Sequence, residues 1–323
     1  MSRLTAALAA VTVLTVTASG CVTVHGEREV VPSATKAEAA QALRDFTDAY
    51  NRADKAYDPA LDAGRVTGPL GAVNQAGLKA RRVTNPGGNP QHVPLALTDA
   101  KYAIPKKAGW PRWFVADTDS NRDQDTGAGD TRWLLVFVRS GPQDVWKVAH
   151  LLVLGPKEIP VFALDKDGWA EPVRPDDTSL AVAPKDLSEQ YASYLQSGRP
   201  ENFAPGPNTS EWRTLRKKNA TLPGMSTQYV DQPLDSGDFA PLALRTQDGG
   251  ALAFFATRHF ERQTAARGVR LNVSPDVRAL MTGDAKSVLT KERVSDEAAR
   301  VPAGRGPITV INRLQGLTSA KGE

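Results

Sequence analysis

An acidic segment between two apolar stretches is where this sequence offers side chains that could ligate a metal. Asp117, Asp119, Asn121, Asp123 and Asp125 occupy alternate positions, which is how oxygen ligands are spaced in calcium loops. An EF-hand loop also requires glycine at its sixth position and glutamate at its twelfth, where this chain has arginine and alanine. We therefore interpret the segment as a polar hairpin loop, with a weak calcium site as the alternative.

Histidines are the next candidates, because their ring nitrogens serve both metal binding and proton transfer. The four are His25, His92, His150 and His259, and none lies within ligand spacing of another. His150 alternates in phase with Trp146, Val148 and Leu152 along an expected strand. His259 alternates in phase with Ala253 and Phe255 along another. We interpret both as hydrogen-bonded histidines within or beside a sheet. The alternative is a general base in a pocket.

Motifs of nucleophilic and phosphate chemistry are missing from the sequence. It contains no GxSxG, Walker A, GxGxxG or HExxH motif. Ser33-Ala34-Thr35-Lys36 matches SxxK, but no KTG element accompanies it, and a helix cap explains the stretch better. We therefore expect no catalytic residue, no bound metal and no cofactor.

A single cysteine, Cys21, follows an uncharged stretch, Leu4–Val16. That stretch is too short to span a bilayer but fits the apolar region of a signal peptide. The small residues Ala18, Ser19 and Gly20 precede the cysteine, and this pattern resembles the bacterial lipobox. The resemblance implies cleavage between Gly20 and Cys21, lipidation of Cys21, and anchoring on the extracytoplasmic face of the cell membrane. Leucine is commoner where Ala18 stands.

The overall composition is that of a globular protein and excludes some partners. The 323 residues are 41% hydrophobic and 24% charged, and the net charge is +4. That charge is too small, and the basic runs too short, for a nucleic-acid partner. We expect a monomer.

Helical spacing appears twice in the chain. Thr35 and Glu38 form a capping-box pattern before Leu43, Phe46 and Tyr50, and the helix ends at Asp58-Pro59 at the latest. A weaker helical stretch covers 72–81. A second capping-box pattern starts at Asp186 and its helix ends at Gly198, and Ser210–Lys218 forms a further short helix.

Strand patterns follow each helical region. Arg132–Arg139 is apolar on both faces, as in a central strand, and Gln247–Gly250 forms a hairpin turn. The expected strands are Val93–Ile104, Trp113–Ala116, Arg132–Arg139, Val145–Leu154, Ile159–Leu164, Gln228–Leu234, Phe239–Thr246, Ala251–Arg262, Val269–Val273, Ser287–Val294 and Ile308–Leu314.

The repeated order of helix, short helix and antiparallel strands predicts an α+β fold of two tandem domains, each with a long helix packed on a curved sheet. The expected segments are a signal peptide (1–20), a tether (21–34), a first domain (35–155), a linker (156–184), a second domain (185–317) and a tail (318–323). This order resembles the cystatin-like or nuclear-transport-factor-2-like superfamily. The composition also resembles an uncharacterised actinobacterial lipoprotein family.

These features predict an exported, membrane-anchored surface lipoprotein that binds a small ligand or an envelope protein without catalysis. Two alternatives remain. One is a cone-shaped enzyme, such as a cyclase or isomerase, in which His150 or His259 is the base. The other is a structural assembly factor of the envelope. A cavity holding a histidine beside a carboxylate would favour the enzyme, and a closed core would favour the assembly factor.

Overall fold

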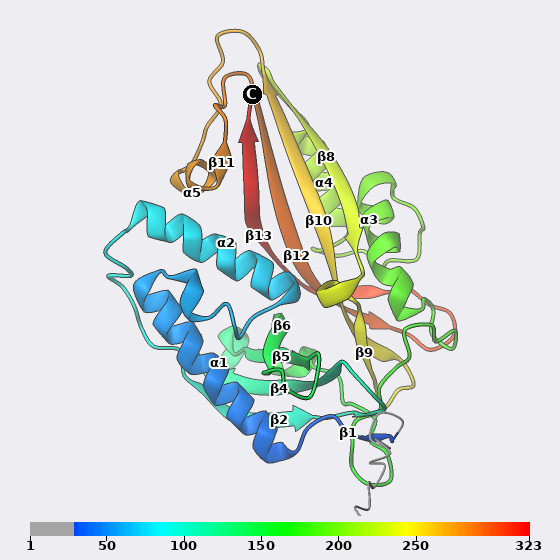
Figure 1. Cartoon of the computed structure of the whole chain (residues 1–323). Coiled ribbons are helices and arrows are strands. Elements are labelled where there is room, and N and C mark those ends of the chain that lie inside the picture. The colour runs from blue at the N-terminus through cyan, green and yellow to red at the C-terminus, as the bar shows by residue number, and fades with distance from the viewer. Residues whose placement is uncertain (1–28) are drawn as a thin grey trace, which may run out of the picture.

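The computed structural model describes residues 29–323, which form an α+β fold as expected (Figure 1). Within that range no helix is long and apolar enough to cross a membrane. The helices are α1 (Lys36–Ala56), α2 (Gly68–Thr84), α3 (Leu187–Ser197), α4 (Ser210–Asn219) and α5 (Pro275–Ala279), with 3-10 turns η2 (Pro59–Leu61), η3 (Gly127–Gly129), η4 (Pro156–Glu158), η5 (Pro184–Asp186) and η6 (Gly237–Phe239).

The strands fall into one antiparallel sheet, a second sheet that is antiparallel except for the parallel pair β11–β13, and one short pair. They are β1 (Val31–Pro32), β2 (Leu97–Ala103), β3 (Lys106–Lys107), β4 (Arg112–Ser120), β5 (Arg132–Arg139), β6 (Lys147–Leu154), β7 (Thr221–Leu222), β8 (Met225–Leu234), β9 (Leu242–Arg245), β10 (Ala251–Ala265), β11 (Met281–Thr282), β12 (Val288–Val301) and β13 (Thr309–Gly322).

The first sheet has the strand order β2-β4-β5-β6, and α1 packs on one of its faces. Helix α1 begins where expected: the Thr35 hydroxyl accepts from the Glu38 amide, and the Glu38 carboxylate accepts from the Thr35 amide. Its apolar side, including Leu43 and Phe46, packs against Phe137 and neighbouring residues of the sheet. Strand β5 is buried on both faces, as predicted for a central strand.

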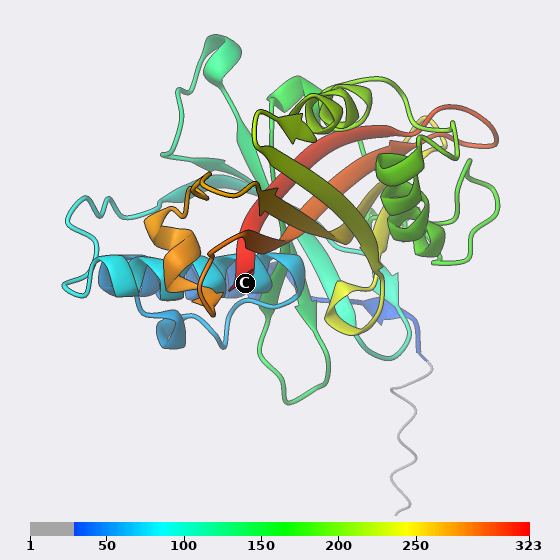
Figure 2. The same cartoon turned by 90° about the horizontal axis from the view of Figure 1, so that it is seen from above.

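The second sheet has the order β11-β13-β12-β10-β8-β7, and β9 pairs with β10. One of its faces packs on α3 through Leu187, Tyr191 and Leu195. Helix α4 lies on the same side, and α2 lies on the opposite side of the long strands β12 and β13 (Figure 2).

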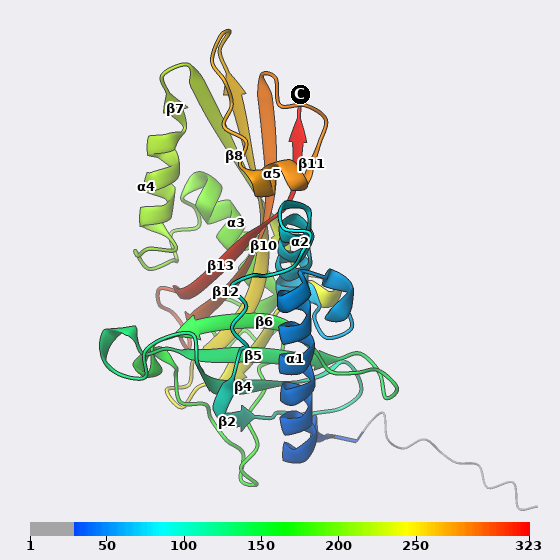
Figure 3. The ribbon, with the colours of Figure 1, turned by 90° about the vertical axis from the view of Figure 1, so that its left-hand side faces the viewer.

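The two sheets pack on each other through a common hydrophobic core. Val115, Leu134 and Leu152 of the first sheet join Leu252 and Phe254 of the second in one buried cluster. The layers therefore run from α1 through the first sheet and the second sheet to α3 and α4, and Figure 3 shows α1 and α4 on opposite sides of the molecule.

Several expected segment boundaries are corrected by this packing. Residues 156–184, expected as a linker, contain the buried Ala170, Val173 and Leu180 and form bridges to Leu244 and Ala303. The expected tail, 318–323, is largely the end of β13. The end of the expected tether is also folded, because β1 pairs with β3.

Two expected strands are also wrong. Ile159–Leu164 forms only isolated bridges, at Phe162 and Leu164, and residues 269–273 form no strand. Apolar residues in these segments instead pack against neighbouring elements: Ile159 and Phe162 border the core between the sheets, and Val273 packs near Val277. Val161, Leu164 and Val269 are exposed, so these short apolar runs predicted burial only in part and the backbone incorrectly.

Candidate functional site

A buried polar cluster lies on the face of the second sheet that α3 and α4 cover. Thr257 and His259 project to this side from β10, because they alternate in phase with Phe255, which packs on Tyr191 of α3. The phase predicted for His259 relative to Phe255 is confirmed. His259 is 3% exposed and Thr257 is fully buried.

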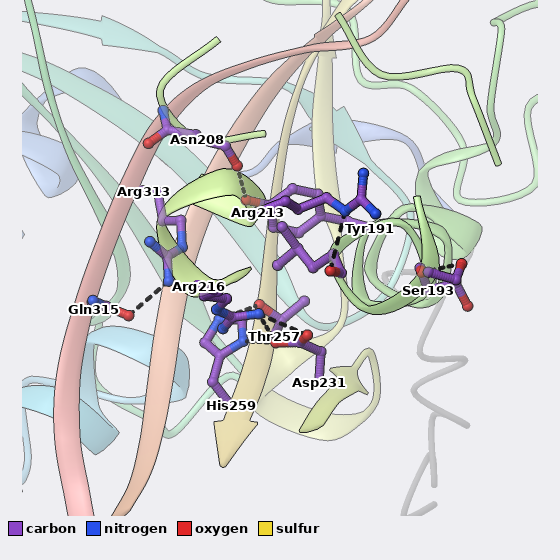
Figure 4. Close-up of polar contacts among 12 residues, drawn as sticks. Tyr191, Ser193, Asn208, Arg213, Arg216, Asp231, Thr257, His259, Arg313 and Gln315 are labelled. Carbon is purple, nitrogen blue, oxygen red and sulfur yellow. Dashed lines mark hydrogen bonds and ion pairs between the residues drawn. The ribbon is translucent and has the colours of Figure 1, made fainter. Parts of the chain in front are cut away.

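His259 has a carboxylate partner on the neighbouring strand. The register of β8 and β10 places Asp231 directly opposite His259, and Nδ1 lies 2.5 Å from Asp231 Oδ1. Arg216, at the end of α4, places one guanidinium nitrogen 2.8 Å from each oxygen of the same carboxylate (Figure 4). Burial alone would raise the pKa of Asp231, but the hydrogen bond from His259 and the charge of Arg216 outweigh it and lower that pKa.

The other ring nitrogen of His259 continues the chain of hydrogen bonds. Nε2 lies 3.1 Å from Thr257 Oγ1, and that hydroxyl lies 2.6 Å from Glu297 Oε1 on β12. Because the Asp231 carboxylate only accepts, Nδ1 carries a proton. The Thr257 hydroxyl donates to Glu297, so it can only accept from Nε2.

Two arginines stack on one tryptophan beside this cluster. The guanidinium carbon of Arg313 lies 4.0 Å from the ring centre of Trp212, and that of Arg216 lies 5.1 Å from it. Arg216 is also 5.1 Å from the Tyr229 ring, and Arg313 donates to Gln315 at 2.7 Å. Such contacts are attractive because the ring face is electron-rich. Burial lowers the pKa of Arg313.

Cavities open on two sides of Arg216. One of about 450 Å³ reaches His259, and another of about 550 Å³ reaches Asp231. The first is formed by residues of α4 and of strands β7, β8, β10, β12 and β13; those used below are Trp212, Leu215, Arg216, Leu222, Tyr229, His259, Arg293 and Gln315. The cluster is therefore the buried floor of a hollow on the surface.

The contacts from Asp231 to His259 and from His259 to Thr257 link an acid, a base and a hydroxyl in the order found in a nucleophilic triad. Thr257 has no exposed surface, however, and its hydroxyl is already bonded to Glu297. No substrate carbonyl can approach that oxygen in this arrangement. The three residues act here as a hydrogen-bonded network within the sheet.

His150 lies in a separate place, between the two sheets. Its Nδ1 is 2.6 Å from Asp296 Oδ1 on β12, and the other carboxylate oxygen accepts from the Leu151 amide at 2.8 Å. All of these atoms are buried, and burial raises the pKa of Asp296. Nε2 of His150 has no partner among the described residues.

The phase predicted for His150 holds relative to Leu152 but is wrong relative to Trp146 and Val148, because β6 contains a bulge. His150 pairs with Val136, but Val148 pairs with Phe137, so Ala149 is an extra residue in the strand. Trp146 and Val148 therefore face α1, while His150 and Leu152 face the second sheet. A bulge leaves no clear signal in the alternation of a single strand.

The structure does not bring the two histidines together. Asp296 and Glu297 are neighbours on β12 and point to opposite faces, one to His150 and the other to Thr257. The reasoning from sequence missed these two acids and also Arg216, Asp231 and Trp212. Their positions depend on strand register and on where α4 packs on the sheet, and local sequence patterns encode neither.

The structure brings together only three of the five candidate metal ligands in the acidic loop. Carboxylate oxygens of Asp119, Asp123 and Asp125 lie within 4.8 Å of one another. Asp117 instead pairs with Arg132, and Asn121 bonds to the backbone of residues 94 and 96. Three such oxygens are fewer than the six to eight that Ca²⁺ takes, and β4 and β5 are the antiparallel pair expected on either side of a hairpin loop. We keep the polar-loop interpretation.

The predicted processing and lipidation residues, Gly20 and Cys21, lie outside the described residues.

Comparison with known proteins shows the family. The chain belongs to the family described as Domain of unknown function (DUF8094), which matches residues 30–322. A Streptomyces coelicolor protein named an uncharacterized lipoprotein is 57% identical over 316 residues, covering 98% of this chain and 94% of its own length. An uncharacterized lipoprotein of Streptomyces avermitilis is 56% identical and covers 99% and 96%. A second S. coelicolor protein with that description is 28% identical over 70% of this chain and 64% of its own. These relatives confirm the expected resemblance to a family of uncharacterized lipoproteins.

Proposed function

We propose that this protein is a lipid-anchored lipoprotein whose folded part binds a small ligand in the cavity beside Arg216 and His259, without catalysis. The lipobox pattern ending at Cys21 and the names of its relatives support the anchor. Diacyl anchoring would hold residues 29–323 at the extracytoplasmic face of the cell membrane. The tandem cystatin-like or nuclear-transport-factor-2-like interpretation of the fold stays a prediction.

The observation that carries the binding proposal is the cavity of about 450 Å³ over the buried polar cluster. This volume falls within the range of small-molecule sites. Its wall combines aromatic rings, Trp212 and Tyr229, with the buried cation Arg216. Such a wall offers stacking and charge-assisted hydrogen bonds together. A purely structural assembly factor would have no need of this hollow.

Catalysis is the second candidate, because His259 lies in the cavity wall beside the carboxylate of Asp231. This is the arrangement expected of a general base. Against it, both ring nitrogens already contact other protein groups, Asp231 and Thr257. A base would have to break the contact with Thr257 before it could take a proton from a ligand. Binding is therefore the function that the geometry supports better.

Native mass spectrometry of the full-length protein purified from membranes tests the binding proposal. We expect a small molecule to copurify, and Trp212→Ala to lose it. Trp110→Ala is the matched control, because Trp110 also carries stacked arginines, Arg112 and Arg139, but lies away from the cavity. The proposal fails if both variants keep the molecule or both lose it. It also fails if nothing copurifies and no compound of a metabolite panel raises the melting temperature.

The anchor has its own test. Cys21→Ser should release the protein from the membrane or stall its processing, because serine cannot carry the thioether-linked lipid. Fractionation of cells, with immunoblotting for size, measures both outcomes. A Cys21→Ser protein that stays on the membrane and is cleaved normally contradicts the lipoprotein assignment.

A further inference from the structure

We infer that the ligand of this cavity is an anionic amphiphile, with a carboxylate or phosphate group against Arg216 and Trp212 and an apolar chain along Leu215 and Leu222. This inference rests on the proposed binding function and adds the chemical class of the ligand. Three features of the cavity carry it: the arginines at its floor, their unpartnered donors together with that of Trp212, and the exposed leucines in its outer part.

Guanidinium groups outnumber their carboxylate partners at the floor of the cavity. Arg216 pairs with Asp231 at 2.8 Å, and Arg313, which stacks on the same tryptophan as Arg216, has no ion pair within residues 29–323. A buried charge without a partner is costly, so an anion in the cavity would complete the cluster.

Charged groups around the cavity do not cancel this excess. Glu261 lines the wall but pairs with Lys291 at 3.0 Å. Arg293 also lines the wall, directly opposite His259 on β12, and has no ion pair within residues 29–323. A ligand in the cavity therefore meets a surface with surplus positive charge, which favours negatively charged groups.

Unpartnered hydrogen-bond donors gather at the same place. Arg216 Nε, Arg313 Nε and Trp212 Nε1 are buried and have no partner within the described part of the chain. Both arginines stack on the Trp212 ring, so the three donors belong to one group of side chains. Glu297 Oε2 is an unpartnered acceptor of the cluster; Trp212 and Arg216 line the cavity, whereas Arg313 and Glu297 lie behind its lining. Carboxylate and phosphate oxygens are the acceptors that satisfy such N–H groups best.

Two exposed leucines lie in the outer part of the cavity, beside the exposed polar residues Asn219 and Gln315. Leu215 on α4 and Leu222 on β7 line it and are 47% and 43% exposed. Arg216 and His259, which are 7% and 3% exposed, form its inner part. A ligand that places a charged group inside would therefore lay its remaining length against exposed leucines. Burying that apolar surface is favourable by roughly 25 cal/mol per Å², which selects a hydrocarbon chain.

The test uses the full-length lipoprotein in nanodiscs of zwitterionic lipid, with octanoate, octyl phosphate, 1-octanol, acetate and inorganic phosphate as probes. Ligands that bind the native state raise the melting temperature. We expect a saturable rise with octanoate or octyl phosphate, and a much smaller one with the other three. The two amphiphiles distinguish carboxylate from phosphate as the preferred group. Each probe is also titrated into nanodiscs without protein, and the heat measured by calorimetry corrects for the share of probe that enters the lipid.

Variants test whether the anionic amphiphile stabilises the protein by binding in this cavity. Arg293→Gln should weaken binding of the anionic amphiphile roughly tenfold, as expected for loss of one charged contact. Arg305→Gln is the matched control, because it removes the same charge from an exposed turn outside the cavity. Leu222→Asn should weaken octanoate binding without changing the response to acetate.

Each remaining result overturns the inference. Equal stabilisation by 1-octanol removes the need for charge, and equal stabilisation by acetate or inorganic phosphate removes the need for a chain. Equal weakening by Arg293→Gln and Arg305→Gln places the effect outside the cavity, and no response to either amphiphile rejects the ligand class. If mass spectrometry instead finds a neutral or cationic molecule that Trp212→Ala loses, the proposed binding function stands and only this inference fails.

Discussion

At the scale of single residues, the two histidine–aspartate pairs have opposite electrostatic surroundings. Asp231 has a cation, Arg216, bonded to both of its oxygens, in addition to His259. Asp296 has His150 and one backbone amide, and lies wholly within the core between the sheets. The pKa of Asp231 is therefore lowered, and burial raises the pKa of Asp296.

This contrast predicts opposite pH dependences. Because the folded-state pKa of Asp231 is below its ordinary value of 3.8, its contribution to stability is present above pH 3.8 and is lost as the pH falls below it. The folded-state pKa of Asp296 is above 3.8, so its contribution is present below pH 3.8 and is lost as the pH rises above it. Asp231→Asn should reduce the loss of stability that occurs as the pH falls below 3.8. Asp296→Asn should remove the loss of stability that occurs as the pH rises above 3.8.

Urea unfolding at a series of pH values measures both effects. Asp231→Asn should also cost about 3–5 kcal/mol at neutral pH, because Arg216 loses a buried partner. Asp296→Asn should cost about 1–3 kcal/mol, since an amide cannot accept from both His150 and Leu151. Parallel pH profiles for the two variants would contradict the assignment.

At the scale of elements, two similar sequence patterns at helix starts have different outcomes. The pattern at Thr35 forms the reciprocal capping box. The pattern at Asp186 does not, because the preceding residues form η5 and leave Asp186 with helical backbone angles and no side-chain cap bond. The residue types were right in both places, but the backbone that leads into the helix decided the result.

Removal of each side chain tests this difference. Thr35→Ala should lower the free energy of unfolding by about 1 kcal/mol, because the Glu38 amide loses the hydroxyl that accepts its hydrogen bond, while the backbone amide of residue 35 still donates to the Glu38 carboxylate. Asp186→Ala, the matched control, should change it by less than about 0.5 kcal/mol. Denaturant unfolding of the two variants measures both values. A larger loss in Asp186→Ala would show that a cap forms there too.

The contact of α2 with the second sheet depends on a glycine. A Cβ added to Gly316 on β13 would lie 2.3 Å from Val73 Cγ1. Gly316→Ala should therefore cost about 1–3 kcal/mol through overpacking. Val73→Ala removes the clashing methyl groups, so the double variant should recover part of the loss in a double-mutant cycle. Additive losses would show that the two residues do not meet.

Most helices and strands could be predicted from the sequence, because periods of 3.6 and 2 mark one-sided burial. Helix α4 and strand β5 agree closely with their expected bounds. The candidate site could not be predicted to the same degree. The phase of His259 was visible, but Asp231 became its partner only through the β8–β10 register. The bulge at Ala149, which reverses the phase of His150, depends on backbone geometry in the folded sheet.

At the scale of the whole molecule, the two α+β halves share their most buried layer. Strand β12 contributes Asp296 to the core between the sheets and Glu297 to the site under α4. Residues 156–184 close the edge of this core with Ala170 and Ile159. The cavity proposed as a ligand site therefore rests on a sheet whose other face packs on the first half.

This packing predicts that the two halves unfold together. Phe254, fully buried between the sheets and 6.0 Å from the His150 ring, belongs to the second half. Phe254→Ala should cost about 3–5 kcal/mol. Five of the six tryptophans lie in residues 110–169, so fluorescence reports mainly on the first half, while far-ultraviolet circular dichroism reports on both. If the core between the sheets couples them, both signals should shift to the same lower midpoint, and calorimetry should show one transition. A fluorescence midpoint that stays unchanged, or a second calorimetric peak, would mean that each half is held by its own helix-on-sheet core and that the face between the sheets adds little.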